Sequence, residues 1–200
     1  MALLDIKNCL DPVLRKVCLP IENIDGELVT LAENMVETTL AAPGVGLAAN
    51  QIGLPWRLFV VNIGVETDKE NLVTVINPEV TAMEGNEIGE EGCLSIPDVV
   101  AEVNRASQIE IKGYDLDGNE VRYEAQGYLA RAFQHEMDHL NGILFWDNIG
   151  KMKRDILKRK FKKKIKSSEH CVYGNTRIRA SYPESPAPFF AFRTFDHHST

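Results

Sequence analysis

The sequence lacks a long apolar run, a secretion signal and a cysteine framework. A membrane-spanning helix needs about 20 consecutive apolar residues, and the nearest candidate, residues 58–63, is far shorter. The N-terminal segment carries Asp5, Lys7 and Asn8 and has neither the basic start nor the apolar centre of a secretion signal. The four cysteines are scattered along the chain, which is typical of proteins in a reducing compartment. We therefore expect a cytoplasmic protein without a membrane segment.

The apolar and charged fractions are those of an ordinary globular protein. Apolar residues make up 44% of the 200 residues and charged residues make up 26%. These values exclude a long disordered chain, a collagen and a disulfide miniprotein. A chain of this length predicts one domain with an appendage. We expect a folded body over residues 1–150, a basic helix over residues 151–166, and an irregular or disordered tail over residues 167–200.

The net charge of −7 hides an uneven distribution. Residues 1–150 contain 9 lysines and arginines against 25 acidic residues, whereas residues 151–200 contain 13 against 4. Ten of the basic residues lie between Lys151 and Lys166. The acidic body should repel DNA, whereas the basic helix favours an anionic partner. A basic run is also common as a solvated helix face, and that alternative stays open.

The spacing of apolar residues predicts helices and strands along the whole body. Asn141-Gly142 is a typical helix end, and Asp117-Gly118 between two strand-like runs predicts a hairpin. Helices are expected at residues 28–40, 126–140 and 151–166, buried strands at 58–62 and 72–76, and hairpin strands at 109–114 and 120–123.

The strongest chemical signal is a His-Glu-x-x-His run at residues 135–139. Two histidines four residues apart on a helix point the same way and can bind one metal ion. Glu136 follows the first histidine, where its carboxylate could reach a water molecule on the metal. Core packing explains the run poorly, because neighbouring apolar residues already supply a buried helix face. The run therefore predicts His135 and His139 as metal ligands.

A site with two histidines needs a further ligand, and Cys93 is the best candidate. Cys93 stands in the segment Glu-Glu-Gly-Cys-Leu-Ser at residues 90–95, which predicts a polar, glycine-containing turn. Most lone cysteines are small buried thiols, but this context favours a ligand. Together with His135 and His139, Cys93 would leave a fourth position open for water, as in a catalytic site.

The third feature is the segment Gly-Val-Gly-Leu-Ala-Ala-Asn-Gln at residues 44–51. A single Gly-x-Gly is usually only a turn. Here small residues alternate along an extended run, which lets another backbone approach closely. Gln51 ends the run with an amide that can donate a hydrogen bond. The segment therefore predicts a place where a peptide binds as an added strand.

Together the three segments resemble the motifs of the peptide deformylase family. The family's motifs are Gly-x-Gly-x-Ala-Ala-x-Gln, Glu-Gly-Cys-x-Ser and Gln-His-Glu-x-Asp-His. This chain has them in the same order at residues 44–51, 91–95 and 134–139, within a similarity that covers about residues 3–165. The resemblance implies an α+β fold in which antiparallel strands wrap around a central metal-binding helix, with a basic C-terminal helix. It also implies that residues 1–150 are a metal-dependent catalytic domain.

The resemblance implies a metal-dependent amide hydrolase that acts on formyl-methionyl nascent polypeptides. The reaction would remove the N-terminal formyl group and release formate. Cys93, His135 and His139 would hold one divalent ion, and Glu136 would be the general acid/base. One thiolate and two imidazoles suit zinc, nickel, cobalt or iron(II), and the resemblance favours iron(II).

The resemblance also implies how the substrate is held. Gln51 and the backbone N–H of Leu94 would stabilise negative charge on the formyl oxygen. The peptide would lie along the glycine-rich segment, with its methionine side chain in an apolar pocket. The residues expected to contact the peptide are Gly44, Val45, Gly46, Leu94, Tyr128 and Ala132. Arg131 is expected to face solvent, and Arg105 is expected to pair with Asp138 and brace the histidine-bearing helix.

The resemblance gives the basic helix a candidate partner. Substrates of the family emerge from ribosomes, and some members dock there through a C-terminal helix. The helix at residues 151–166 is therefore expected to bind ribosomal RNA phosphates, with an affinity that falls as salt rises. The segment after Ser167 exceeds the usual family length, and the sequence gives it no role.

Two other functions stay open from the residues alone. A zinc peptidase shares the His-Glu-x-x-His run but normally takes its third ligand downstream, where Asp147 and Asp155 stand outside any ligand-like turn. A ribosome-binding module with a purely structural metal would keep its ribosome affinity without Glu136 and would release no formate.

Overall fold

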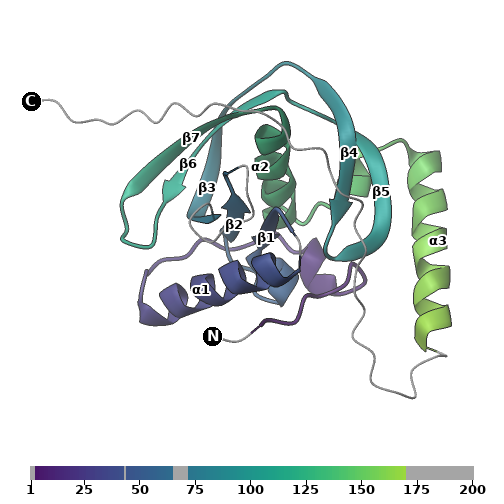
Figure 1. The fold of residues 1–200 in the computed structure, drawn as a ribbon, viewed down its shortest axis with the longest axis horizontal. Coiled ribbons are helices and arrows are strands. Elements are labelled where there is room, and N and C mark those ends of the chain that lie inside the picture. The colour runs from purple at the N-terminus through teal and green to yellow at the C-terminus, as the bar shows by residue number, and fades with distance from the viewer. Residues whose placement is uncertain (1–2, 43, 65–71, 170–200) are drawn as a thin grey trace, which may run out of the picture.

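The computed structural model describes residues 3–42, 44–64 and 72–169. These residues form a mixed fold in which antiparallel strands surround a central helix (Figure 1), which confirms the predicted α+β fold with a C-terminal helix. The helices are α1 (Gly26–Ala41), α2 (Gly127–Leu140) and α3 (Lys151–Glu169), with 3-10 turns η1 (Pro12–Arg15), η2 (Ala49–Ile52) and η4 (Phe145–Asn148). The strands are β1 (Gly46–Ala48), β2 (Leu58–Asn62), β3 (Leu72–Glu84), β4 (Glu87–Cys93), β5 (Ile96–Arg105), β6 (Gln108–Tyr114) and β7 (Glu120–Gln126).

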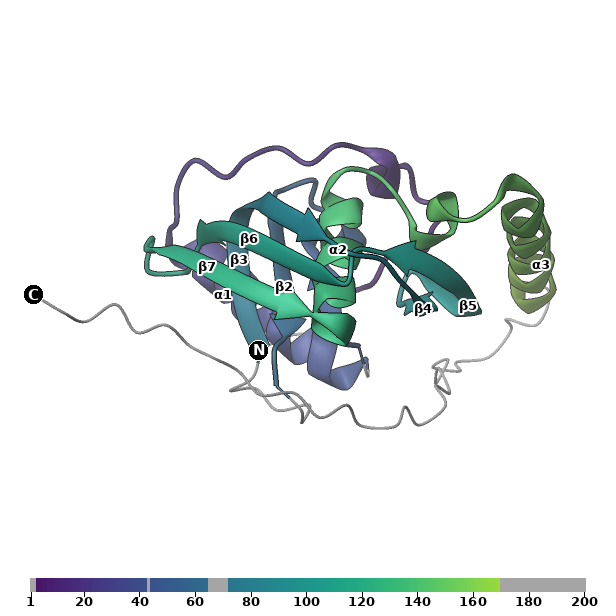
Figure 2. The same cartoon turned by 90° about the horizontal axis from the view of Figure 1, so that it is seen from above.

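Helix α2 lies between two sheets (Figure 2). The larger sheet has the strand order β1-β2-β3-β6-β7, whereas β4 and β5 form a separate two-stranded sheet, called the β4–β5 ribbon below. Phe133 on α2 packs against the larger sheet, with ring centroids 6.0 Å from Phe59 and 5.8 Å from Tyr123. Another face of α2 meets the ribbon through side-chain hydrogen bonds such as that from Arg131 to the carbonyl oxygen of Val103. The helix is therefore apolar toward the larger sheet and polar toward the ribbon.

The ends of the helices follow local sequence signals. The side chain of Asp25 accepts hydrogen bonds from the backbone N–H groups of Glu27 and Leu28, at 3.1 and 3.0 Å, and so caps α1. Helix α2 ends before Gly142, which has a φ of +72°. A Cβ at Gly142 would lie 2.7 Å from the carbonyl oxygen of Arg15. Glycine is required there by both the backbone angle and the close approach of another chain segment.

Strand β3 is longer than the sequence predicts. The predicted strand covers only residues 72–76, because the apolar, β-branched run ends at Ile76. In the structure the chain forms a bulge at this point, with Asn77 at a φ of +49°, and β3 then continues along β6 to Glu84. The Asn77 side chain binds the backbone N–H and C=O of Ile21 at 2.8 Å each, and these bonds hold the bulge in place.

The hairpin of β6 and β7 is where the Asp117-Gly118 signal predicts it. The Asp115 side chain accepts hydrogen bonds from the backbone N–H groups of Asp117 and Asn119, at 3.0 and 2.8 Å. Gly118 has a φ of +81°, which suits glycine in a tight turn. The turn is therefore fixed by its own residues.

Helix α3 lies against η4 and the ribbon at one end of the molecule (Figures 1 and 2). Phe161 is 3% exposed, and its ring centroid lies 5.9 Å from that of Trp146. Lys158 Nζ lies 5.4 Å from the Trp146 ring and 3.3 Å from an Asp147 carboxylate oxygen. The helix extends to Glu169, and residues 170–200 of the expected tail lie outside the described residues. Within the described ranges, no helix combines the length and apolar character that a bilayer span requires.

We expect Asp147→Asn to lower the free energy of unfolding by about 1–2 kcal/mol at pH 7, as is usual for lost bonds to a charged group. Burial alone would raise the pKa of Asp147, but bonds from Arg15 and the Leu144 N–H, together with the charge of Lys158, lower it below its ordinary 3.8. A carboxyl group whose pKa is lower in the folded protein than in the unfolded chain stabilises the fold at pH values above its ordinary pKa. This stabilisation is lost as the pH falls through the folded-state pKa. Urea unfolding measures the free energy of unfolding of the wild type and of Asp147→Asn from pH 7 downward. The difference between the two free energies should shrink as the pH falls. Asp117→Asn, in the exposed hairpin turn, is the control. The prediction would be contradicted if the free-energy difference between the wild type and Asp147→Asn stayed the same at every pH.

Candidate metal centre and active site

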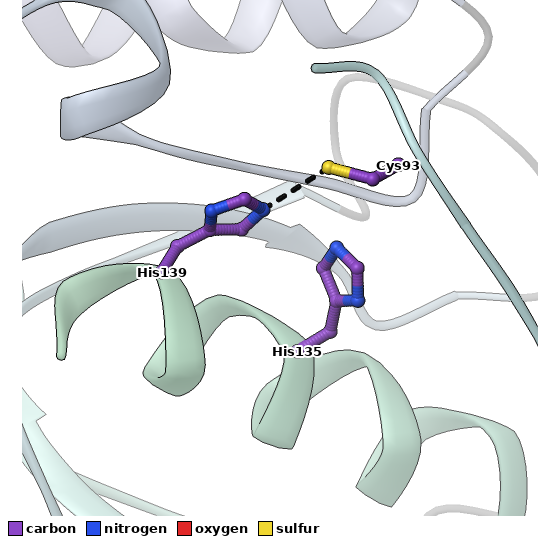
Figure 3. Close-up of side chains that lie close together, drawn as sticks. All are labelled: Cys93, His135 and His139. Carbon is purple, nitrogen blue, oxygen red and sulfur yellow. Dashed lines mark hydrogen bonds between the residues drawn. The ribbon is translucent and has the colours of Figure 1, made fainter. Parts of the chain in front are cut away.

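Helix α2 and the end of strand β4 bring three ligand-type side chains together. His135 and His139 lie one turn apart on α2, and Cys93 is the last residue of β4 (Figure 3). One potential ligand atom from each lies within 4.8 Å of the others, and Cys93 Sγ is 3.2 Å from His139 Nε2. Cys93 and His139 are 4% and 1% exposed. One thiolate and two imidazole nitrogens at this spacing are a fitting donor set for a divalent transition metal ion.

The two imidazoles are held in orientations that suit a cation. His135 Nδ1 lies 3.1 Å from a Glu91 carboxylate oxygen, and the other ring nitrogen points toward Cys93 (Figure 3). A carboxylate behind a histidine fixes the ring and makes it a stronger ligand. Burial lowers the pKa of His139, and the neighbouring His135 lowers it further. His139 is therefore neutral, as a metal ligand must be. Burial would lower the pKa of His135, but its contacts with Cys93 and Glu91 raise it, so His135 must lose a proton when a metal binds.

Glu136 is buried beside this cluster and is only 3% exposed. Its Oε2 has no hydrogen-bond partner among the described residues. Burial raises the pKa of Glu136 to about 7, with a contribution from Glu91 and an opposing one from His135. A carboxyl group with a pKa near neutrality can both accept and return a proton at physiological pH.

Gln51 is oriented toward the cluster by three hydrogen bonds. Its Oε1 accepts from the backbone N–H of Ala48 at 2.8 Å, so the amide nitrogen must face the other way. Nε2 lies 3.2 Å from Ser95 Oγ and 3.6 Å from Cys93 Sγ. The structure therefore brings an amide donor from the first motif next to the cysteine of the second.

The glycines of the first motif allow close contacts with the other two motifs. A Cβ at Gly44 would lie 2.7 Å from Leu94 Cδ1, and a Cβ at Gly46 would lie 2.5 Å from Glu136 Oε1. The expected extended run is only partly extended, because β1 covers Gly46–Ala48 and the chain then coils into η2. This turn brings Gln51 to the cluster.

The expected side-chain pocket residues lie in different environments. Val45 and Ala132 pack in the same apolar cluster, whereas Leu94 packs in another one. Tyr128 is 45% exposed. The structure therefore brings only Val45 and Ala132 into one apolar cluster, and a pocket formed by all four residues stays a prediction.

Glu91 is a site residue that the sequence analysis missed. Its carboxylate accepts bonds from Arg105 at 2.8 and 3.0 Å, from Arg131 at 2.8 Å, and contacts His135. Burial would raise the pKa of Glu91, but the bonds from His135 and Arg105 lower it to about 2. The second motif could have revealed Glu91, because Glu91 is its first residue and lies two positions before Cys93.

The geometry around Glu91 confirms one expectation from the sequence and corrects two others. Arg105 Nη1 donates to Asp138 at 2.6 Å, which confirms the expected pair. Arg131 does not face solvent as expected, since it is 6% exposed and bonded to Glu91. Cys93 is not within a turn as expected, because β4 runs up to it and the turn follows. Buried carboxylate and carbonyl acceptors hold Arg131 inside, which one-dimensional helix periodicity cannot show.

The segment of residues 7–18, called the N-terminal strap below, contacts all three motif regions. The backbone N–H of Lys7 donates to the carbonyl oxygen of Gln51 at 2.7 Å. The N–H of Cys9 donates to Ser95 at 2.9 Å, and that of Cys18 to Leu140 at 2.8 Å. One short segment therefore fixes pieces of chain that are far apart in sequence.

Comparison with known proteins gives one consistent result. The model of the polypeptide deformylase family matches residues 3–155. A peptide deformylase of Syntrophobacter fumaroxidans is 45% identical over 168 residues, which cover 84% of this chain and 99% of the relative. That of Rhizobium meliloti is 49% identical over 158 residues, covering 78% and 91%. The crystal structure of a peptide deformylase from Legionella pneumophila has a TM-score of 0.79 at 38% identity, covering 84% and 98%.

We expect Gly46→Ala to lower formate release from a formyl-methionyl peptide by about 100-fold, the usual cost of displacing a reacting group by about 1 Å. The added methyl group would stand 2.5 Å from Glu136 Oε1 and displace the carboxylate. Metal content should not change, because the three atoms nearest to the added methyl group all belong to Glu136, which is not one of the three ligands. Parallel metal analysis and formate assays test this, with Gly26→Ala, which has open space around it, as the control. Full activity of Gly46→Ala would contradict the assigned place of Glu136.

Proposed function

The chain belongs to the polypeptide deformylase family, whose members remove the formyl group from the N-terminus of nascent peptides, and we propose which of its residues perform this reaction. Members of this family are metal-dependent hydrolases. The cluster of Cys93, His135 and His139 beside the unpartnered carboxylate of Glu136 supports the assignment most directly. In this proposal the three residues hold one divalent ion and Glu136 is the general acid/base.

Iron(II) is the proposed native metal, and zinc, nickel and cobalt fit the same donors. When bound, such an ion supplies Lewis-acid activation of a water molecule and of the formyl carbonyl group. Cys93 contributes a thiolate and the two histidines contribute neutral nitrogens, so the donor set carries one negative charge. Glu91 keeps the ring of His135 turned toward the cluster.

Glu136 moves the proton of the reaction. Its carboxylate accepts a proton from the attacking water as the water oxygen bonds to the formyl carbon. It then returns the proton to the amine nitrogen as the C–N bond breaks. The products are formate and a peptide with a free N-terminus. Because its pKa is about 7, Glu136 is balanced for both transfers.

Gln51 and the backbone N–H of Leu94 stabilise the charge that develops on the formyl oxygen. The Gln51 amide is held in place before the substrate arrives by its bond from Ala48. Donors fixed in this way lower the barrier because they need no reorganisation, and one such donor contributes about 3 kcal/mol. Leu94 follows Cys93 directly, so its N–H lies at the edge of the same cluster.

The peptide substrate is proposed to bind as a strand along β1. Strand β1 is at the end of the five-stranded order, paired with β2 on one side only among the described residues. The other edge of β1 has backbone groups that an extended peptide can pair with. The methionine side chain would enter the pocket expected at Val45, Leu94, Tyr128 and Ala132.

The zinc-peptidase alternative fails on its third ligand. Cys93, which lies upstream of α2, meets the two histidines. Asp147 is instead occupied by Arg15, Lys158 and the Leu144 N–H, and Asp155 is exposed on α3. Family membership likewise excludes a purely structural role for the metal.

The function is tested by formate release and metal content of anaerobically purified protein. We expect Glu136→Gln to lose formate release by about 1,000-fold, within the range for a general acid/base, and to keep its metal, because Glu136 is not a ligand. Undiminished turnover with metal bound would remove Glu136 from the mechanism. Cleavage of internal amide bonds without formate release by the wild-type protein would overturn the assigned reaction.

Helix α3 is proposed to bind ribosomal RNA, which would place the enzyme in the cytoplasm at its source of substrate. Some of its lysines hold the helix on the body, since Lys153 pairs with Glu102 and Lys158 with Asp147. Arg159, Lys160 and Lys163 are exposed. These outward charges suit phosphate groups.

We expect the double variant Lys160→Glu/Lys163→Glu to weaken ribosome binding by at least about 10-fold, and wild-type binding to fall by at least about 10-fold from 50 to 200 mM salt. Co-sedimentation with ribosomes measures both effects. Lys112→Glu, which changes a partly exposed charge on β6, is the control. Binding that ignores both salt and the α3 charges would contradict the proposed role of the helix.

A further inference from the structure

Arg131 crosses from α2 to the β4–β5 ribbon, although it lies one turn before His135 on the helix. Its guanidinium donates to the Glu91 carboxylate at 2.8 Å and to the carbonyl oxygen of Val103 at 2.9 Å. It also donates to the carbonyl oxygens of Glu87 at 2.8 Å and Gly89 at 3.3 Å. One side chain therefore binds both strands of the ribbon at once.

The ribbon leaves a space for this guanidinium at Gly89. A Cβ at Gly89 would lie 3.0 Å from the central guanidinium carbon and from one of its terminal nitrogens. Gly89 has no positive φ, so the backbone itself does not require glycine there. The close approach of the Arg131 side chain therefore explains why a residue without a Cβ stands at position 89.

The charges in this region balance only when Arg131 is counted. Glu91 and Asp138 are acidic, and Arg105 bonds to both of them. Arg131 supplies the second positive charge, through its bond to Glu91. A buried carboxylate is costly unless it is paired and fully hydrogen-bonded. Arg131 thus shares with Arg105 the pairing of the buried Glu91 carboxylate.

The ribbon carries Cys93, whereas α2 carries the two histidines. The ribbon shares no strand pairing with the larger sheet in the described part of the chain. Side-chain contacts therefore help to set its distance from α2, and Arg131 makes three of them, each a hydrogen bond to a backbone carbonyl oxygen of the ribbon. We propose that Arg131 is a positioning residue for the metal centre, holding Cys93 at the right distance from His135 and His139. This rests on the proposed function only in taking these three residues as the metal ligands.

The first test measures metal affinity in Arg131→Met, which keeps the aliphatic stem and loses all donors. Zinc-loaded protein is titrated with a chelator, and we expect a dissociation constant for zinc about 10–100-fold above wild type, as is usual when support behind a ligand is lost. The cobalt-substituted protein should show an altered thiolate-to-cobalt absorption band. Arg131→Lys, which keeps the charge and part of the donors, should lie between Arg131→Met and wild type.

Arg122→Met is the matched control, because Arg122 makes an exposed pair with Glu120 on β7. It should bind zinc like the wild type. If Arg131→Met binds zinc and cobalt as wild type does, the proposal is overturned. An Arg131→Lys variant that binds no better than Arg131→Met would assign the loss to packing and would also overturn it.

Gly89→Ala decides the question if Arg131→Met does not fold. The methyl group would displace the guanidinium by a few tenths of an ångström without removing its charge, and we expect zinc affinity to fall by about 5-fold, below the loss from removing the arginine. Gly150→Ala, which has open space around it, is the control. Unchanged zinc affinity in Gly89→Ala would overturn the proposal. Formate release by the wild type is measured alongside, so a failure of the proposed function would appear there and not in the comparison of variants.

Discussion

A carboxylate shielded from water, that of Glu91, connects the parts of the metal centre. It is 6% exposed and receives bonds from two arginines while it contacts His135. An acid in that position is tolerated only because every oxygen has a charged or polar partner. The requirement extends outward, since Arg105 must also pair with Asp138 and Arg131 must pass Gly89. Much of the polar interior thus follows from one buried charge.

Helix α2 combines two kinds of packing on one short element. Phe133 and Leu140 are fully buried and fix the helix by apolar contacts. On its polar face, Gln134 binds both the N–H and C=O of Ala106, at 3.0 and 2.9 Å. Asn50 donates to the carbonyl oxygen of His139 at 2.5 Å. The apolar face provides stability, and the polar face provides orientation, so the histidines stand on a helix that is fixed along its whole length.

Local patterns were enough to predict the helices, the β6–β7 hairpin and the cluster of Cys93, His135 and His139. These features depend on spacing, turn residues and ligand chemistry, all of which can be seen in one dimension. The second half of β3 could not be predicted, because it depends on the bond between Asn77 and a distant segment at Ile21. The burial of Arg131 could not be predicted for the same reason, since the groups that accept its hydrogen bonds come from another part of the chain. A charged residue on a helix looks like a surface residue until its partners are known.

The N-terminal strap has a consequence for how this chain is made. Its bonds reach Gln51, Ser95 and Leu140, so the strap is synthesised before its partners and meets the last of them only after most of residues 19–140 have followed. Contacts between such distant residues form slowly because a long loop must close. The metal centre cannot be completed before the ribosome has synthesised residues 134–140, which contain the third motif and Leu140. An enzyme that trims other growing chains must therefore wait for most of its own synthesis before it can act.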